Sequence, residues 1–203
     1  MALAYIADIE SYIPDYYGQR ERDSLSAYAL WVRDLAGQRD TSKAETLYQD
    51  RGDELAVDAI AWLWSSIDDT GMRDDIERTL NNRAVETAGA ANFTTEYGDS
   101  SYLVMQSDRR TDGIVLDALI ANSPDSDLIP KVVAGLLANK VKGRWNNVQE
   151  NAFILLALKS YFDEYEAQTP AFVATVWLGD RFAGEHSFQG RETDRVNLTI
   201  PTS

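Results

Sequence analysis

The stretch that decides the fold is GRWNNVQENAFILLAL, residues 143–158. Gly143 favours a break in the chain, and Asn147 with Glu150 three residues later matches a helix-capping box in which asparagine replaces serine or threonine. The residues after Glu150 are mainly apolar, as in a helix that is largely buried. The stretch therefore predicts a turn at 143–146 followed by a helix over 147–163.

Helical patterns dominate the chain upstream of this stretch. We predict further helices over 24–32, 53–67, 72–88, 109–121 and 127–140. Asp23 is the predicted N-cap of the first of them. Segment 53–67 is apolar almost all round, which predicts burial on more than one side, whereas 72–88 is more polar and is expected nearer to solvent.

A weak internal repeat suggests that these helices are paired. The run LDAL at 116–119 recurs as LLAL at 155–158, about 40 residues later, which is the period of a helix-pair repeat. The breaks at 123–126 and 143–146 are short, and short loops make consecutive helices antiparallel neighbours. The sequence therefore predicts a mainly α fold, either a solenoid or a closed toroid of helix pairs.

Two stretches depart from the helical pattern. Residues 91–106, with a turn at Tyr97-Gly98, predict a small inserted β-hairpin. After residue 170 the apolar period becomes two, which predicts strands over 172–178 and 181–188 joined at Gly179-Asp180, with a third around 196–200. We predict two domains, a helical one over 1–168 and the start of a β domain over 169–203.

The charge balance excludes some classes of partner. Thirty-three acidic residues against 19 basic ones give a net charge of −14, so nucleic acids and anionic membranes are disfavoured as partners. Cysteine is absent, which excludes disulfides, thiolate metal sites and cysteine nucleophiles. The first residues lack the basic region of a signal peptide, so an export signal is expected only upstream or already removed.

The residues that usually carry catalysis do not cluster in the sequence. The single histidine, His186, is too few for a metal site or a triad. Acidic pairs such as Asp68-Asp69 and Asp74-Asp75 occur at helix starts, where they favour the helix dipole. The five tryptophans mostly lie in apolar runs and are expected in the core. We therefore predict no catalytic, cofactor-binding or metal-binding residue and no enzymatic activity.

At this point the stretch 143–158 carries a resemblance to a known family. It resembles the segment G-x-W-x-(S/T)-T-Q-(D/E) followed by L-x-A-L in the alpha-2-macroglobulin and complement thioester family. The matching positions, taken as a structural motif, are Arg144, Trp145, Asn147, Gln149 and Glu150. Segments 107–119 and 24–30 resemble earlier inner helices of the bacterial members.

The resemblance implies that residues 1–168 are the C-terminal part of an α/α toroid, the thioester-type domain of these proteins. It implies a role as a structural part of a broad-spectrum protease trap in the periplasm or cell envelope. Its partners would be target proteases, through the full-length protein, and neighbouring domains of the same chain. The family's thioester needs a cysteine, so no thioester residue can be assigned here.

Two other functions stay open at the level of sequence. Helix-pair toroids also include enzymes of the terpene cyclase and glycosidase types, which need an acidic, aromatic-lined cavity. A helical repeat can instead serve as an interaction scaffold through its concave face. In either case the apolar N-terminal residues Leu3, Tyr5, Ile6, Ile9 and Ile13 are expected to form an open flank that frays or self-associates.

Overall fold

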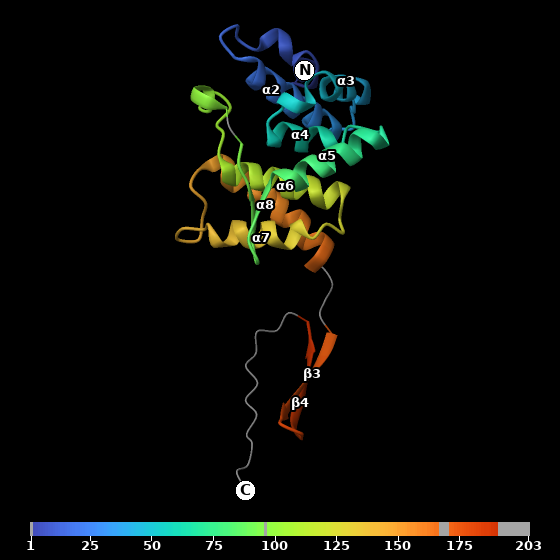
Figure 1. Cartoon of the computed structure of the whole chain (residues 1–203), viewed down its shortest axis with the longest axis vertical. Coiled ribbons are helices and arrows are strands. Elements are labelled where there is room, and N and C mark those ends of the chain that lie inside the picture. Colours follow the sequence, from blue (N-terminus) through green and yellow to red (C-terminus); the bar gives the residue numbers. More distant parts are fainter. Residues whose placement is uncertain (1, 96, 167–170, 191–203) are drawn as a thin grey trace. The chain divides into compact units, whose positions relative to one another are not determined.

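A computed structural model describes residues 2–95, 97–166 and 171–190. In these ranges the chain is mainly helical and contains two small two-stranded sheets. Residues up to Tyr161 form one compact unit, and those from Phe162 onward form a second. The two units are described separately below (Figure 1).

The first unit is mainly helical. It begins with α1 (Ala2–Ala7) and a 3₁₀ helix (Ile9–Tyr12), and continues with α2 (Gln19–Leu35), α3 (Thr41–Arg51), α4 (Val57–Trp64), α5 (Thr70–Arg83), α6 (Asp108–Asn122), α7 (Leu128–Ala138) and α8 (Val148–Tyr161). Helix α2 packs against α4, α4 against α6, and α6 against α8, so these four helices form one layer. Helices α3, α5 and α7 pack against members of this layer.

The core of this unit is centred on α4. Every residue from Val57 to Trp64 is buried, as its all-round apolar sequence predicts. In contrast, α5 buries only Ile76 and Leu80, which confirms the expected position near solvent. Among the described residues, no helix is both long and apolar enough to cross a bilayer.

The sequence misplaced the start of α2 and missed α3. Asp23 is not an N-cap, because α2 already begins at Gln19 after Gly18. Asp23 instead lies within the first turns of α2, and its side chain is buried. Its Oδ2 lies 3.1 Å from Nε of Arg51 in α3. Helix α3 was missed because only Ala44 and Tyr48 of its polar sequence are buried. Its one local signal is Asp40, which accepts a hydrogen bond from the Lys43 backbone N–H.

The inserted hairpin is real but lies earlier than predicted. Strand β1 (Ala84–Glu86) pairs antiparallel with β2 (Ala91–Phe93), and the turn spans 87–90. Residues 97–100 do turn, since the Ser100 N–H donates to the Tyr97 carbonyl at 3.2 Å, but among the described residues this turn joins no paired strands. The Tyr97 side chain enters the core and donates a hydrogen bond to Asp58. Strand β2 lies so close to α7 that a Cβ on Gly135 would meet the Ala91 carbonyl oxygen at 2.6 Å.

The second unit contains a short π-helix (Phe162–Glu166) and a β-hairpin. Strand β3 (Ala171–Leu178) pairs antiparallel with β4 (Arg181–Gln189), as predicted. Gly179 has a φ of +61°, a conformation that favours glycine in the tight turn. The predicted third strand around 196–200 lies outside the described residues.

Candidate functional site: an aromatic groove between α2 and α8

The structure places Trp145 of the motif in the core, where it anchors the α7–α8 turn. Trp145 is 4% exposed, and its Nε1–H donates a hydrogen bond to the Leu136 carbonyl at 2.9 Å. The Lys140 ammonium lies 4.9 Å from the centroid of the indole ring, within cation–π range. Trp145 therefore ties the end of α7 to the start of α8.

Asn147 and Glu150 cap α8, as the capping box predicts. The Glu150 backbone N–H donates to Asn147 Oδ1 at 2.9 Å. The Glu150 carboxylate accepts from the Asn146 backbone N–H at 2.8 Å, one residue before the usual partner. Its other oxygen accepts from the Ser107 hydroxyl at 2.6 Å. Because Ser107 is itself the N-cap of α6, Glu150 joins the starts of two neighbouring helices.

The remaining two motif residues are nearer to solvent. Arg144 is exposed, and its backbone N–H and C=O pair with Val141 across the turn. Gln149 is half-buried, and its amide nitrogen lies 3.9 Å from the sulfur of Met105. The structure thus gives Trp145, Asn147 and Glu150 clear roles in building the fold.

A buried polar network links α2, α4 and α6. The Asp58 carboxylate accepts from the Tyr97 hydroxyl at 2.6 Å and lies 3.3 Å from Arg110. The Tyr97 hydroxyl has one proton, which Asp58 accepts, so the Ser24 hydroxyl must be the donor in its 2.6 Å bond to Tyr97. Burial raises the pKa of Asp58 above its ordinary value, and the positive charge of Arg110 opposes this rise.

A second buried carboxyl fixes the inserted hairpin. Asp112 of α6 accepts a hydrogen bond from the Phe93 backbone N–H at 2.6 Å and lies 3.0 Å from Arg109. Burial raises the pKa of Asp112 to about 7, while the hydrogen bond from Phe93 and the charge of Arg109 lower it. Asp112 therefore changes its charge near neutral pH at the junction of α6 and β2.

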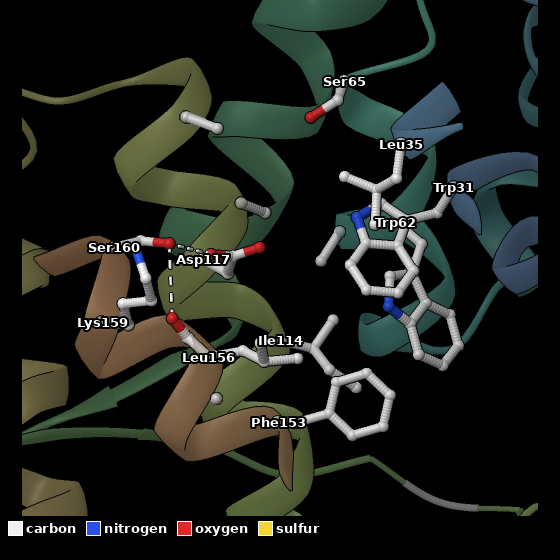
Figure 2. Close-up of a pocket in the computed structure, with 14 residues that line it drawn as sticks. Trp31, Leu35, Trp62, Ser65, Ile114, Asp117, Phe153, Leu156, Lys159 and Ser160 are labelled. Carbon is white, nitrogen blue, oxygen red and sulfur yellow. Dashed lines mark hydrogen bonds between the residues drawn. The ribbon is translucent and has the colours of Figure 1, made fainter. Parts of the chain in front are cut away.

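One hollow of the helical unit is lined by aromatic rings. A space of about 220 Å³ lies among α2, α4, α6 and α8. Figure 2 shows the rings of Trp31, Trp62 and Phe153 on one side of it and Asp117 and Ser160 on the other, where the Ser160 hydroxyl donates to Asp117 at 2.8 Å. The small residues lining it are Ala61, Gly113, Ala118 and Ala121.

A smaller hollow of about 140 Å³ shares Trp62 and Phe153 with the first. Its lining also includes Tyr28, Arg110 and the loop residues Leu103, Val104 and Met105. Arg110 lies over the rings of Trp62 and Phe153, at 5.3 and 5.5 Å from their centroids. We call the two hollows together the aromatic groove.

The sequence did not identify this groove. Its rings come from helices far apart in the chain, so no local motif marks it. The only local signal is the spacing of Tyr28 and Trp31, which places both rings on one face of α2. Among the described residues, no group of three histidine or acidic side chains is arranged to hold a metal ion.

The chain is similar to known proteins both in sequence and in structure. No family model matches the chain. An 86-residue part, 42% of the chain, is 35% identical to an alpha-2-macroglobulin homolog of Nostoc. The Circularly permutated Ras protein 2 of Dictyostelium discoideum is 24% identical over 165 residues, 73% of this chain. The chain spans 4% of the length of each of these relatives.

Solved structures of bacterial alpha-2-macroglobulins share the fold over 93% of the chain. Salmonella alpha-2-macroglobulin reacted with methylamine matches with a TM-score of 0.60 at 17% identity. A structure of the Escherichia coli protein, from domain MG7 to the C-terminus, matches with a TM-score of 0.59 at 14% identity.

This chain resembles bacterial alpha-2-macroglobulins in sequence and in fold. That resemblance, predicted from residues 143–158, is confirmed. The chain covers 12% of the Salmonella protein and 28% of the shorter Escherichia coli structure. It therefore corresponds to a small region of these much longer alpha-2-macroglobulins.

Proposed function

We propose that the chain is a structural part of a bacterial alpha-2-macroglobulin-like protease trap. The observation that carries the proposal is the common fold over 93% of the chain with bacterial alpha-2-macroglobulins, one of which was solved in a trypsin-activated form. In the proposed trap the chain is an arc of an α/α toroid, and α2, α4, α6 and α8 are its inner helices. Residues 169–203 begin the β domain that follows.

The buried hydrogen bonds of the motif favour a structural role for this chain within such a protein. Glu150 joins the starts of α6 and α8, and Trp145 joins α7 to α8. The bonds of Glu150 fix α8 against the neighbouring inner helix α6, and the bond of Trp145 fixes it against α7, as a rigid arc requires. Within the trap, the chain would hold neighbouring domains in place, and bound proteases would be its indirect partners. A periplasmic or envelope location follows from the same proposal.

The enzymatic alternative has less support. An enzyme of the terpene cyclase or glycosidase type needs convergent carboxyls with perturbed pKa values in its cavity. Burial raises the pKa values of Asp58 and Asp112, but neither residue lines the aromatic groove. The groove contains the single carboxylate of Asp117.

The test uses the full-length polypeptide that contains this sequence. It is mixed with trypsin, and the cleavage of a small chromogenic peptide and of casein is then measured, with trypsin alone as the control. A trap leaves peptide cleavage nearly intact and suppresses casein cleavage, because the enclosed protease is accessible only to small substrates. If both substrates are cleaved as fast as by trypsin alone, the trap function is wrong for trypsin-like proteases.

A further inference from the structure

Met105 lies exposed on a loop whose backbone is held by a buried residue. It is 58% exposed and stands just before α6. Its φ of +49° is a left-handed conformation that residues with a side chain rarely adopt. The buried Arg110 holds the loop in this conformation, because its Nη1 donates to the Val104 carbonyl at 2.9 Å and to the Met105 carbonyl at 3.3 Å. The side chain of Met105 therefore projects from a fixed backbone.

The side-chain amide of Gln149 is directed at the sulfur of Met105. Gln149 lies at the start of α8, within the motif at 143–158, and its Nε2 donates to Met105 Sδ at 3.9 Å. Both side chains line the smaller hollow. A thioether sulfur is a weak acceptor, so this hydrogen bond contributes little to the stability of the folded state. The structural role proposed above for the motif does not use the Gln149 side chain.

Oxidation of Met105 gives the Gln149 amide a better acceptor. The sulfur attacks one oxygen of hydrogen peroxide, the O–O bond breaks, and water leaves as the thioether becomes a sulfoxide. The sulfur loses two electrons, and the peroxide gains them. N–H···O hydrogen bonds span about 2.7 to 3.2 Å. An oxygen added on the side of the sulfur that faces Nε2, 3.9 Å away, is therefore within hydrogen-bonding reach of the amide.

Met72, the other methionine that the structure describes, is less accessible. It lies in α5, where its side chain is half-buried and packs against the hydrophobic core. An oxidant in solution has to reach the sulfur, so exposure governs which methionine reacts first. Met105 is therefore the preferred site of the two.

We propose that Met105 is a site of reversible oxidation by peroxides and that Gln149 binds the sulfoxide oxygen of the product. The oxidised loop is then joined to the start of α8 by a stronger hydrogen bond than the thioether accepts. A methionine sulfoxide reductase removes the oxygen and restores the weaker contact. The proposal goes beyond the trap function and does not depend on it, because it rests on side chains within this chain.

The first experiment locates the oxidation. The chain of residues 1–203 is treated with dilute hydrogen peroxide, and the sulfoxide at each methionine is followed by mass spectrometry of its peptide. We expect Met105 to oxidise at least about fivefold faster than Met72. The control is the chain unfolded in urea, in which the two residues should react at similar rates. Equal rates in the folded chain would overturn the assignment of Met105 as the preferred site.

The second experiment measures the contribution of Gln149. It uses chains that carry Met72→Leu, and it compares Gln149 with Gln149→Glu, which has nearly the same size but no N–H donor at neutral pH. Urea unfolding is measured before and after oxidation. We expect oxidation to lower the unfolding equilibrium constant about threefold more in the chain with Gln149 than in the one with Gln149→Glu. Treatment with a methionine sulfoxide reductase should abolish the difference. Met1 is the same in both chains and cancels in the comparison.

Two results of the second experiment would overturn the proposal. An equal effect of oxidation in the two chains means that Gln149 does not bind the sulfoxide. An effect that persists after Met105→Leu means that another residue is responsible. Neither experiment uses a protease, so a failure here is distinguishable from a failure of the trap function.

Discussion

Two apolar segments of this protein, α4 and β3, bury their side chains to very different extents. All eight residues of α4 are buried, and Trp64 is 2% exposed. In β3, which is also mainly apolar, Trp177 is 59% exposed and contacts Phe182 of β4 edge-on. Helix α4 is surrounded by α2, α3, α5 and α6, whereas β3 pairs only with β4 among the described strands.

The difference shows that an apolar run is buried only when enough elements pack around it. A two-stranded hairpin has two faces and no second layer, and it is marginally stable in water by itself. The helical unit has a continuous core of its own. Changes in this core should therefore destabilise the protein far more than changes in the hairpin.

The strongest test removes one tryptophan from each region. Trp64→Ala should lower the free energy of unfolding of the helical unit by about 3 to 5 kcal/mol, because it leaves a large cavity in the core. Trp177→Ala, the matched change in the hairpin, should shift it by less than about 0.5 kcal/mol. Urea unfolding followed by circular dichroism at 222 nm measures both. Equal losses would show that the hairpin stabilises the helical unit.

The second test asks whether breaking the buried Arg110–Asp58 ion pair lowers the free energy of unfolding as much as removing a buried tryptophan. Arg110→Met keeps a long side chain over Trp62 but leaves the Asp58 carboxylate buried without its cation, so we expect a loss of about 3 kcal/mol. Adding Asp58→Asn should recover part of this loss, since it removes the uncompensated charge. Additive losses in the double variant would mean that the two side chains do not act as a pair.

The third test uses pH. The pKa of Asp112 is raised to about 7 in the folded protein, so the folded state binds this proton more tightly than the unfolded state. The resulting stabilisation is complete below about pH 3.8 and is lost as pH rises to about 7. Between pH 5 and pH 8 the wild-type protein should therefore lose more stability than Asp112→Asn, as urea midpoints would show. Parallel pH profiles would contradict this role of Asp112.

The smallest expected effect concerns the cap of α8. Asn147→Ala removes the acceptor of the Glu150 backbone N–H and should cost about 1 kcal/mol, whereas Asn147→Ser keeps an acceptor and should cost less. The urea midpoints of the two variants make the comparison. If serine and alanine are equally destabilising, the side chain of Asn147 contributes little to the cap.

Features set by residues close together in the chain could be predicted from the sequence, whereas those set by contacts between distant residues could not. The turn at Gly179 and the cap of Asn147 on α8 were predictable because each is set by residues close together in the chain. Helix α3 was missed because its sequence is polar and its signals are weak. The hairpin predicted around Tyr97 was wrong, although residues 97–100 do turn, because the strand before it pairs with residues 84–86 and the Tyr97 side chain bonds to the distant Asp58 in the core.

The sequence by itself determined the helical class, the all-round burial of α4, the C-terminal hairpin and the resemblance to bacterial alpha-2-macroglobulins. These features rest on local periodicity, on capping and on the motif at 143–158. Only the tertiary structure decided that Tyr28, Trp31, Trp62 and Phe153 line one groove and that Arg110 is paired with Asp58. The physical reason is that these side chains meet across helices that are separated by many residues, and their contacts depend on how the helices pack.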